Sequence, residues 1–299
     1  MSYDFQTIIH GKWILAGEHA VIRGHGALVF PVKNKTLSLS YQKAAEASSE
    51  LKLSADCIGK NSEDMALLLE RVLKHAVGLL KQPMSILSGT FHVTSSIPAG
   101  VGLGASAALC TAVAQWCVTQ ELITSQEIYS FARNLEHLFH GESSGLDIAG
   151  VASSSGVYFK QGYHTTIELA WAPNWHLSSC NEIGTTFGCI KQVQLLREQN
   201  PKQADLIDQQ MQQSVEKAKK ALEVNTLESK TRLIEAIDKA NHCFHQWGLI
   251  TPALASHMEE LRNAGALAVK PTGSGGGGIV MSLWENGVTP QIGNKPLHF

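Results

Sequence analysis

The sequence has few cysteines and no excess of charge of either sign. None of its six cysteines forms a C-x-x-C pair, which excludes zinc-ribbon and thioredoxin-type sites. The 24 lysines and arginines nearly balance the 26 aspartates and glutamates, which disfavours a dedicated nucleic-acid binder. Only 17% of residues are charged and 44% are hydrophobic, the opposite of a disordered chain. These absences point to a globular protein with a small-molecule ligand.

Long hydrophobic runs and targeting signals are missing too. The most apolar stretch, residues 107–118, contains Thr111 and Gln115 and is too short to span a bilayer. The first residues, MSYDFQTIIHGKW, lack a basic segment followed by a long apolar one, so no secretory signal is predicted. We therefore expect a cytoplasmic protein with free thiols and without a membrane partner.

The chain length favours two domains, because 299 residues at ~150 residues per domain correspond to two. No repeat or low-complexity linker marks a boundary. We place it near residue 165, where a mixed strand and helix pattern becomes mainly helical, so the predicted domains are 1–165 and 166–299. The predicted strands cover residues 26–32, 35–41, 90–97, 156–160, 165–170, 266–270 and 278–284. The predicted helices cover residues 63–80, 105–121, 201–222, 228–248 and 252–264, with a further helix that begins near Thr124 in a capping box.

The segment PAGVGLGASAA (98–108) lies between a predicted strand and a predicted helix. Its glycines permit positive φ and a close approach to a ligand, and the N-terminus of the following helix offers unpaired N–H groups to a phosphate. The hydroxyl of Ser106 could reach a phosphate oxygen or Mg²⁺. The segment matches neither a Walker A loop nor G-x-G-x-x-G, so a tight strand-to-helix turn stays open as the alternative.

A second glycine-rich segment, KPTGSGGGG (270–278), has five glycines. A flexible linker is one interpretation. Apolar strand-like segments flank it closely on both sides, however, and this favours a nest of backbone N–H groups that binds an anion.

Two carboxylates follow the first glycine loop. Glu136 lies at the edge of the apolar stripe of a predicted helix, and Asp147 follows two small residues and a glycine. Taken alone, these are a solvated boundary residue and a turn aspartate. Together with a phosphate loop, they supply a metal ligand and a proton acceptor, which Mg²⁺-dependent phosphoryl transfer needs.

The N-terminal segment HGKWILAGEHAVIRGHGALV (10–29) places Lys12 before a short apolar run that Gly17-Glu18-His19 interrupts. The simplest interpretation is a strand, a turn and a second strand with exposed polar residues. A buried Glu-His pair in the turn would be a substrate contact.

These four segments, in this order, resemble the GHMP kinase superfamily over nearly the whole chain. Within it they look most like the mevalonate kinase family. The residues that carry this resemblance are Gly11-Lys12, Gly17 to Val21 with Gly24, His140-Gly141, Ser144 to Asp147, and Asn241 upstream of Gly248 and Pro252.

The resemblance implies a role for each segment. Asp147 would be the catalytic base or substrate orienter, with Lys12 close to it and to the reacting hydroxyl. Ser106 and Glu136 would hold Mg²⁺. The ATP phosphates would be cradled by Pro98, Gly100, Val101, Gly102, Leu103, Gly104, Ala105 and Ser106. The substrate would be lined or covered by Glu18, His19, Thr272, Gly273, Ser274 and Gly275.

The resemblance also implies a fold and an activity. The expected fold is α+β with two domains, a ribosomal-protein-like N-terminal domain and a ferredoxin-like C-terminal domain, with the active site in the cleft. The expected activity is transfer of the γ-phosphoryl group of ATP to the 5-hydroxyl of mevalonate, with Mg²⁺. A homodimer is the assembly considered.

Five residues depart from the family pattern without removing a proposed catalytic group: His10, Ala105, Ser143, Ile148 and Pro271. Another kinase of the superfamily, for phosphomevalonate or homoserine, is the nearest alternative, although a phosphorylated substrate should need more basic residues than His19. A non-catalytic ATP-binding regulator is the second, although such a protein should have lost the base or a metal ligand.

Overall fold

The computed structural model describes residues 3–44, 50–57, 62–140, 143–182, 184–292 and 295–296. The chain forms two compact units, and each is assembled from separate pieces of sequence. The first comprises Met1–Lys12, Pro31–Ala99 and Gly104–Ser154; the second comprises Trp13–Phe30, Gly100–Leu103 and Ser155–Phe299. The predicted boundary at residue 165 would divide the chain into two continuous segments, unlike these units. The position of the domain boundary stays a prediction.

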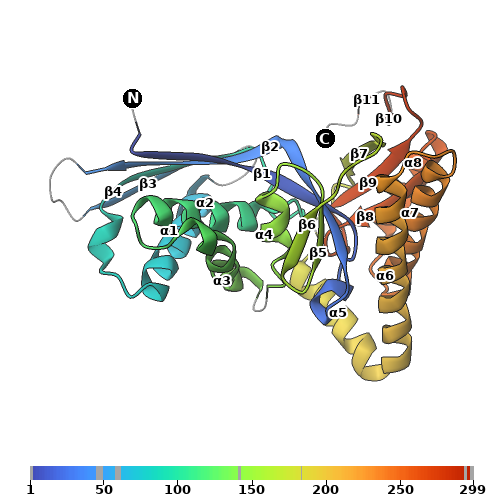
Figure 1. Ribbon diagram of the computed structural model, residues 1–299, viewed down its shortest axis with the longest axis horizontal. Coiled ribbons are helices and arrows are strands. Elements are labelled where there is room, and N and C mark those ends of the chain that lie inside the picture. The colour runs from blue at the N-terminus through green and yellow to red at the C-terminus, as the bar shows by residue number, and fades with distance from the viewer. Residues whose placement is uncertain are drawn as a thin grey trace. The chain divides into compact units, whose positions relative to one another are not determined.

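In the first unit, helices cover one face of a sheet (Figure 1). Strand β4 pairs with β3 in parallel and with β2 antiparallel, and β1 also pairs with β2. Its strands are β3 (Leu51–Cys57), β4 (Gly89–Ser95) and the parts of β1 (Phe5–Ala16) and β2 (Ala27–Lys43) that lie within Met1–Lys12 and Pro31–Ala99. The helices are α1 (Ser62–Leu79), α2 (Ala105–Thr119), α3 (Ile128–His140) and α4 (Leu146–Val151), with 3-10 turns η2 (Met84–Leu87) and η3 (Ser125–Glu127).

The core of the first unit follows from the apolar patterns of its helices. One face of α1 is buried, including Leu69 and Leu73, as its helical spacing predicts. Helix α2 is buried on nearly all sides, and Trp116 meets the rings of Tyr41 and Phe91 edge-on. The predicted capping box is confirmed at Thr124, whose partner is Glu127.

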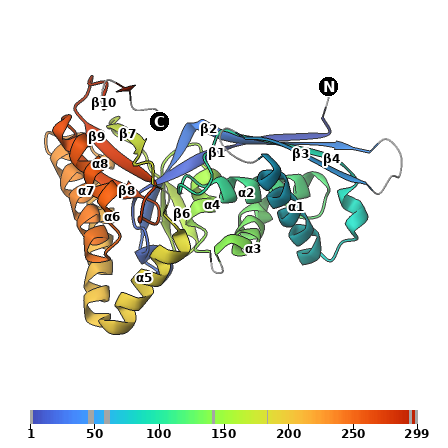
Figure 2. The same ribbon diagram turned by 180° about the vertical axis from the view of Figure 1, so that it is seen from behind.

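The second unit packs helices against a three-stranded antiparallel sheet of order β7-β9-β8, and both ribbon views show α7 and α8 beside it (Figure 2). Pro271 lies on β8, which is an edge strand of this sheet. Proline has no N–H to donate, so it is tolerated on an edge strand but would remove a hydrogen bond from a central one. The strands are β5 (Val157–Lys160), β6 (Tyr163–Thr166), β7 (Asn174–Ser179), β8 (Ala268–Thr272), β9 (Ile279–Trp284), β10 (Gln291–Ile292) and β11 (Lys295–Pro296). The helices are η1 (Ala20–Arg23), α5 (Thr186–Gln199), α6 (Pro201–Glu223), α7 (Ser229–Gln246) and α8 (Pro252–Asn263).

Some predicted elements are wrong. The strands predicted at 26–32 and 35–41 are one strand, β2, whose two halves pair with β5 and β4. The strand predicted at 165–170 is β6, which begins earlier because Gln161 and Gly162 form a two-residue hairpin turn with positive φ at both positions. The other predicted helices and strands are confirmed within a few residues, whereas β3, β7 and α5 have no counterpart in the prediction. No helix in the described ranges is long and apolar enough to cross a membrane.

Candidate functional site

Lys12 and Asp147 meet in the first unit. Nζ of Lys12 lies 2.7 Å from Oδ1 of Asp147, and the Lys12 side chain is 2% exposed while that of Asp147 is 30% exposed. Burying an ammonium is costly unless a counter-charge compensates it, so the pair holds Lys12 in place. The carboxylate, in contrast, stays open to a ligand.

Gly104 sets the space around Lys12. It is the N-cap of α2 with φ +82°, and a Cβ there would lie 2.8 Å from Cγ of Lys12 and 3.1 Å from Cγ1 of Val151. Only glycine fits both the backbone and the packing. The next turn carries Ser106, half-buried, at the helix N-terminus as predicted.

Glu136 of α3 is buried, not solvated as the simpler interpretation of its position would have it. The hydroxyl of Ser143 donates to its Oε2, and the N–H of Gly145 donates to that hydroxyl at 3.0 Å. Burial raises the pKa of Glu136 to about 8, and the charge of Asp147 adds to the rise. Ser143 and Lys12 oppose it, so both groups favour the ionised carboxylate.

The surroundings of Glu136 fit a cation. Its Oε1 is buried and has no hydrogen-bond partner among the described residues. The Glu136 charge also helps raise the pKa of Cys110, which lies one helical turn beyond Ser106 on the same face of α2. No group of three or more His, Cys, Asp or Glu in the described chain could hold a metal on its own. A hydroxyl, one carboxylate and the oxygens of a bound phosphate would suit Mg²⁺.

Glu18 and Lys270 form a buried ion pair in the second unit. They are 3% and 0% exposed, and Nζ lies 2.5 Å from Oε1. Nζ also donates to the carbonyl of Ile14 at 3.3 Å and lies 5.2 Å from the centre of the Phe244 ring. Burial lowers the pKa of Lys270, and Glu18 opposes that shift.

Thr272 attaches the start of the second glycine loop to β1. Its Oγ1 accepts from the N–H of Ile14 at 2.8 Å and donates to the carbonyl of Ile14 at 2.9 Å. Lys270, two residues earlier, reaches the same carbonyl. The loop therefore leaves β8 from a point fixed to the segment that carries Glu18.

His19 contacts the same loop and is nearly buried. Its Nε2 lies 2.8 Å from the carbonyl of Ser274, and because that oxygen can only accept, Nε2 carries the proton and Nδ1 remains an acceptor. The rings of Phe244 and Trp247 meet the imidazole edge-on. Burial lowers the pKa of His19 to about 4, so the imidazole is neutral at neutral pH.

The two glycine loops touch in the second unit. Gly102 and Gly273, both with positive φ, face each other, and a Cβ on either would be in ordinary van der Waals contact with the backbone of the other loop, at 3.5–3.7 Å. A small cavity between the loops is lined mainly by backbone. Its lining comprises Gly100, Val101, Gly102, Gly184, Thr272, Ser274, Gly275, Gly277 and Gly278. The anion nest expected of the second glycine loop stays a prediction.

The structure thus collects the predicted residues into two groups. Lys12, Gly104 and Asp147, with Glu136, belong to the first unit, and Glu18, His19 and the second glycine loop belong to the second. The loop from Pro98 to Ser106 contributes to both units. Gly141 of the predicted signature lies outside the described residues.

Sequence reasoning missed several supporting residues. Lys270 is the single charge within the apolar run ALAVKP, which could have marked it as a buried partner for an acid. In the sequence Ser143 stands out only as a departure from the family pattern, because its contact with Glu136 depends on the path of the chain after α3. The aromatic pair around His19 carries no sequence signal beyond the apolar stripe of α7.

Comparisons with known proteins match two family models to this chain, in N-terminal to C-terminal order. The model of the GHMP kinases N terminal domain matches residues 67–156, and that of GHMP kinases C terminal matches residues 212–290. A protein named mevalonate kinase from Pyrococcus abyssi is 29% identical over 299 residues, which cover 91% of this chain and 86% of the relative.

Two solved structures show the likeness of fold. L. major mevalonate kinase in complex with R-mevalonate aligns with a TM-score of 0.77 and 21% identity over 95% of this chain and 88% of that one. S. pneumoniae phosphomevalonate kinase in complex with phosphomevalonate and AMPPNP aligns with a TM-score of 0.73 and 15% identity, over 94% and 92% of the two chains. The two neighbours hold different small molecules, mevalonate in one and phosphomevalonate in the other, so fold alone does not distinguish substrates.

Proposed function

Because the chain belongs to the GHMP kinases, ATP-dependent small-molecule kinases whose N-terminal and C-terminal models it matches in order, we propose that it transfers the γ-phosphoryl group of ATP to the 5-hydroxyl of mevalonate. The products would be 5-phosphomevalonate and ADP. The observation that carries the chemistry is the ion pair between Lys12 and Asp147, which leaves a carboxylate open beside a buried ammonium. The relatives named mevalonate kinase support the choice of acceptor.

In this proposal Asp147 orients the attacking hydroxyl and accepts its proton. Lys12, 2.7 Å away, stabilises the negative charge of the transition state. Phosphoryl transfer needs little covalent chemistry from the protein, so positioning and charge account for catalysis.

Ser106 and Glu136 would hold Mg²⁺, which supplies neutralisation of the phosphate charge when ATP is bound. The unpartnered Oε1 of Glu136 supports this role. The backbone N–H groups of the loop from Pro98 to Ser106 would bind the phosphates. The second glycine loop, Thr272 to Gly275, would cover them and the acceptor.

His19 supports mevalonate over a phosphorylated acceptor. A neutral imidazole with Nδ1 as acceptor suits a hydroxyl group better than a phosphate dianion. Arg23 is a cation close to His19, but its guanidinium is paired with the carboxylate of Asp208. We therefore do not expect it to bind the phosphate of an acceptor. Glu18, bound by Lys270, holds the segment that carries His19.

A substrate panel tests the proposal. The full chain with ATP and Mg²⁺ is assayed for ADP release with mevalonate, phosphomevalonate, homoserine and galactose. We expect turnover with mevalonate and little with the other three. Turnover with only one of the other three compounds would show that mevalonate is not the acceptor and would leave the kinase assignment in place. ATP binding without turnover of any compound would favour a non-catalytic ATP-binding regulator.

Location and assembly are part of the proposal. The six cysteines are all free, which supports a reducing compartment such as the cytoplasm. A homodimer stays a prediction, and light scattering on the purified chain would measure the mass that decides it.

A further inference from the structure

His19 occupies a strained turn. Its φ is +58° and its ψ −46°, and the N–H of Ala20 donates to the carbonyl of Glu18 at 2.6 Å. This is a γ-turn with positive φ at its central residue, a rare and strained conformation. Such strain persists only where the surroundings hold the backbone. The question is which contacts hold it here.

The packing of the turn itself is small. In the 3-10 turn η1 that follows, only Ala20 and Val21 are buried, and Ile22 is 49% exposed. Two short apolar side chains bury little surface. On this side of the turn, the N–H of Val21 donates to the carbonyl of Gly17 at 3.0 Å, and a polar anchor at the end of η1 adds a side-chain constraint.

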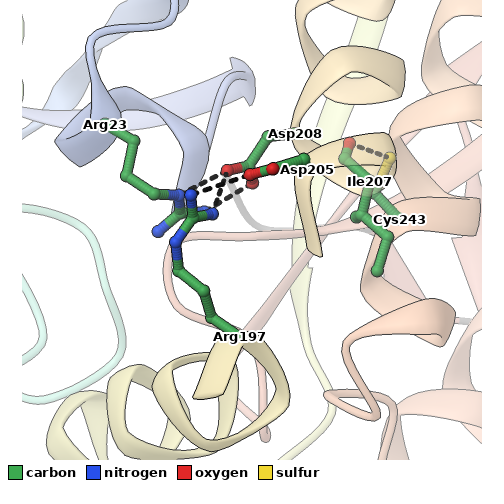
Figure 3. A network of polar contacts seen from close by, with 6 residues as sticks. All are labelled: Arg23, Arg197, Asp205, Ile207, Asp208 and Cys243. Carbon is green, nitrogen blue, oxygen red and sulfur yellow. Dashed lines mark hydrogen bonds and ion pairs between the residues drawn. The ribbon is translucent and has the colours of Figure 1, made fainter. Parts of the chain in front are cut away.

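Arg23 supplies that anchor (Figure 3). Its Nε and Nη2 donate to Oδ2 and Oδ1 of Asp208, a two-pronged pair whose aspartate side chain is 3% exposed. Arg197 of α5 adds a contact to Oδ2 of Asp208 at 3.4 Å, and its other nitrogen donates to Asp205 at 2.7 Å. A two-pronged arginine–carboxylate pair fixes orientation as well as distance.

The helix that carries Asp208 is itself held firmly. The thiol of Cys243 in α7 donates to the carbonyl of Ile207, and the hydroxyl of Ser214 donates to the carbonyl of Ala236 at 2.7 Å. One turn after Asp208, Gln212 accepts from the N–H of Gly26 at 2.6 Å. Gly24 ends η1. Helix α6 therefore contacts the chain on both sides of Gly24, at Arg23 before it and at Gly26 after it.

We propose that Asp208 is a positioning residue that acts through Arg23 to hold the γ-turn at His19 in the geometry that binds the phosphoryl acceptor. This assignment rests on the proposed function, in which His19 contacts the acceptor. The charges of both Arg23 and Asp208 influence the pKa of His19, in opposite directions, so the pair lies close enough for its loss to be felt at the imidazole.

The kinetic test compares two matched variants, Asp208→Asn and Asp205→Asn. Both remove one carboxylate charge from α6 and from the same network, but only Asp208 touches Arg23. For Asp208→Asn we expect KM for mevalonate to rise roughly ten- to a hundredfold, the effect of a misplaced binding group, with KM for ATP nearly unchanged. Asp205→Asn should leave both constants at wild-type values.

A second readout does not depend on turnover. In protein labelled with ¹⁵N-histidine, the ring signals of His19 are identified by their absence from His19→Gln. Asp208→Asn should shift these signals and Asp205→Asn should not. Arg23→Lys keeps the positive charge but cannot form the two-pronged contact with Asp208, so it should also shift the His19 ring signals. This variant replaces Asp208→Asn in the test if Asp208→Asn does not fold.

The outcomes separate the two proposals. Wild-type protein without mevalonate turnover overturns the proposed acceptor, and the His19 signals then decide the role of Asp208 alone. A folded Asp208→Asn with wild-type His19 signals and wild-type KM for mevalonate overturns the positioning role. Equal losses of mevalonate and ATP binding, with a lowered Tm, would overturn it as well, because they indicate a general structural role.

Discussion

Lys12 and Asp147 are paired across 2.7 Å, yet their exposure differs more than tenfold, 2% against 30% of the side chain. The asymmetry matters because a fully buried pair would be closed to a ligand, whereas here the carboxylate can meet a ligand while its counter-ion stays shielded from water. Shielding strengthens the field that the ammonium exerts at the carboxylate. The pair therefore suits transfer of a charged group beside it.

Replacing Asp147 by Asn should slow the chemical step and spare nucleotide binding. The amide cannot accept the proton of the attacking hydroxyl, so we expect kcat to fall by roughly 10²–10⁴-fold. The Kd for ATP, measured by calorimetry, should stay near the wild-type value. The double variant Lys12→Met, Asp147→Asn should be little slower than the slower single variant, since the pair acts as a unit. An unchanged kcat in Asp147→Asn would remove Asp147 from the mechanism.

Glu136 should make the metal-free protein less stable as the pH rises. Its pKa in the folded state, about 8, lies above its usual value of 4.5, so the proton on Glu136 stabilises the fold below about pH 4.5. This contribution is lost as the pH rises through the folded-state value. Glu136→Gln stays neutral at every pH and does not undergo this loss. Urea unfolding should therefore show the variant close to wild type at pH 5 and more stable by at least about 1 kcal/mol at pH 9.

Adding Mg²⁺ with ADP at pH 9 tests whether Glu136 binds the metal. The cation would replace the lost proton, so it should raise the Tm of the wild type and raise that of Glu136→Gln less. The same rise in both proteins would mean that Glu136 does not bind the metal.

Lys270→Met should destabilise the second unit strongly. It leaves the carboxylate of Glu18 buried without its ammonium, which costs about 3–5 kcal/mol. Adding Glu18→Gln to it should recover much of that loss in urea unfolding. Lys230 pairs with Glu285 on the surface, where both side chains are about half exposed, and Lys230→Met should change stability by no more than about 1 kcal/mol. A small effect of Lys270→Met would show that water reaches Glu18.

Gly104→Ala tests the close approach between the phosphate loop and Lys12. Positive φ costs a non-glycine residue about 1–2 kcal/mol, and the new Cβ would push against the Lys12 stem. We expect kcat to fall about tenfold because Lys12 moves from Asp147. Gly78→Ala is the matched control, since a Cβ there meets nothing within 4 Å and the helix α1 should gain about 0.5–1 kcal/mol. Equal kinetics for the two variants would contradict this role of Gly104.

The order of four motifs was sufficient to predict the family and its two-domain α+β fold, and both are confirmed. Helices α1, α6 and α7 were predictable because a long apolar stripe with a period of 3.6 residues has few alternatives. Strand β3 and helix α5 were not, since β3 has only half-buried and exposed residues and α5 buries only two side chains. Their structure depends on neighbours that the local pattern does not contain.

The sequence by itself determined which chemical groups are present: a lysine, two carboxylates, a hydroxyl and two glycine loops, at spacings that a kinase uses. Only the tertiary structure decided their states. Burial turned Glu136 from a boundary residue into a carboxyl with a raised pKa, and gave Glu18 the partner Lys270. Pairing energies and pKa values depend on distance and solvent access between residues far apart in the chain, and neither quantity is written in local sequence. The same holds for the anchor of His19, where Arg23 meets Asp208 only because α6 passes beside the turn.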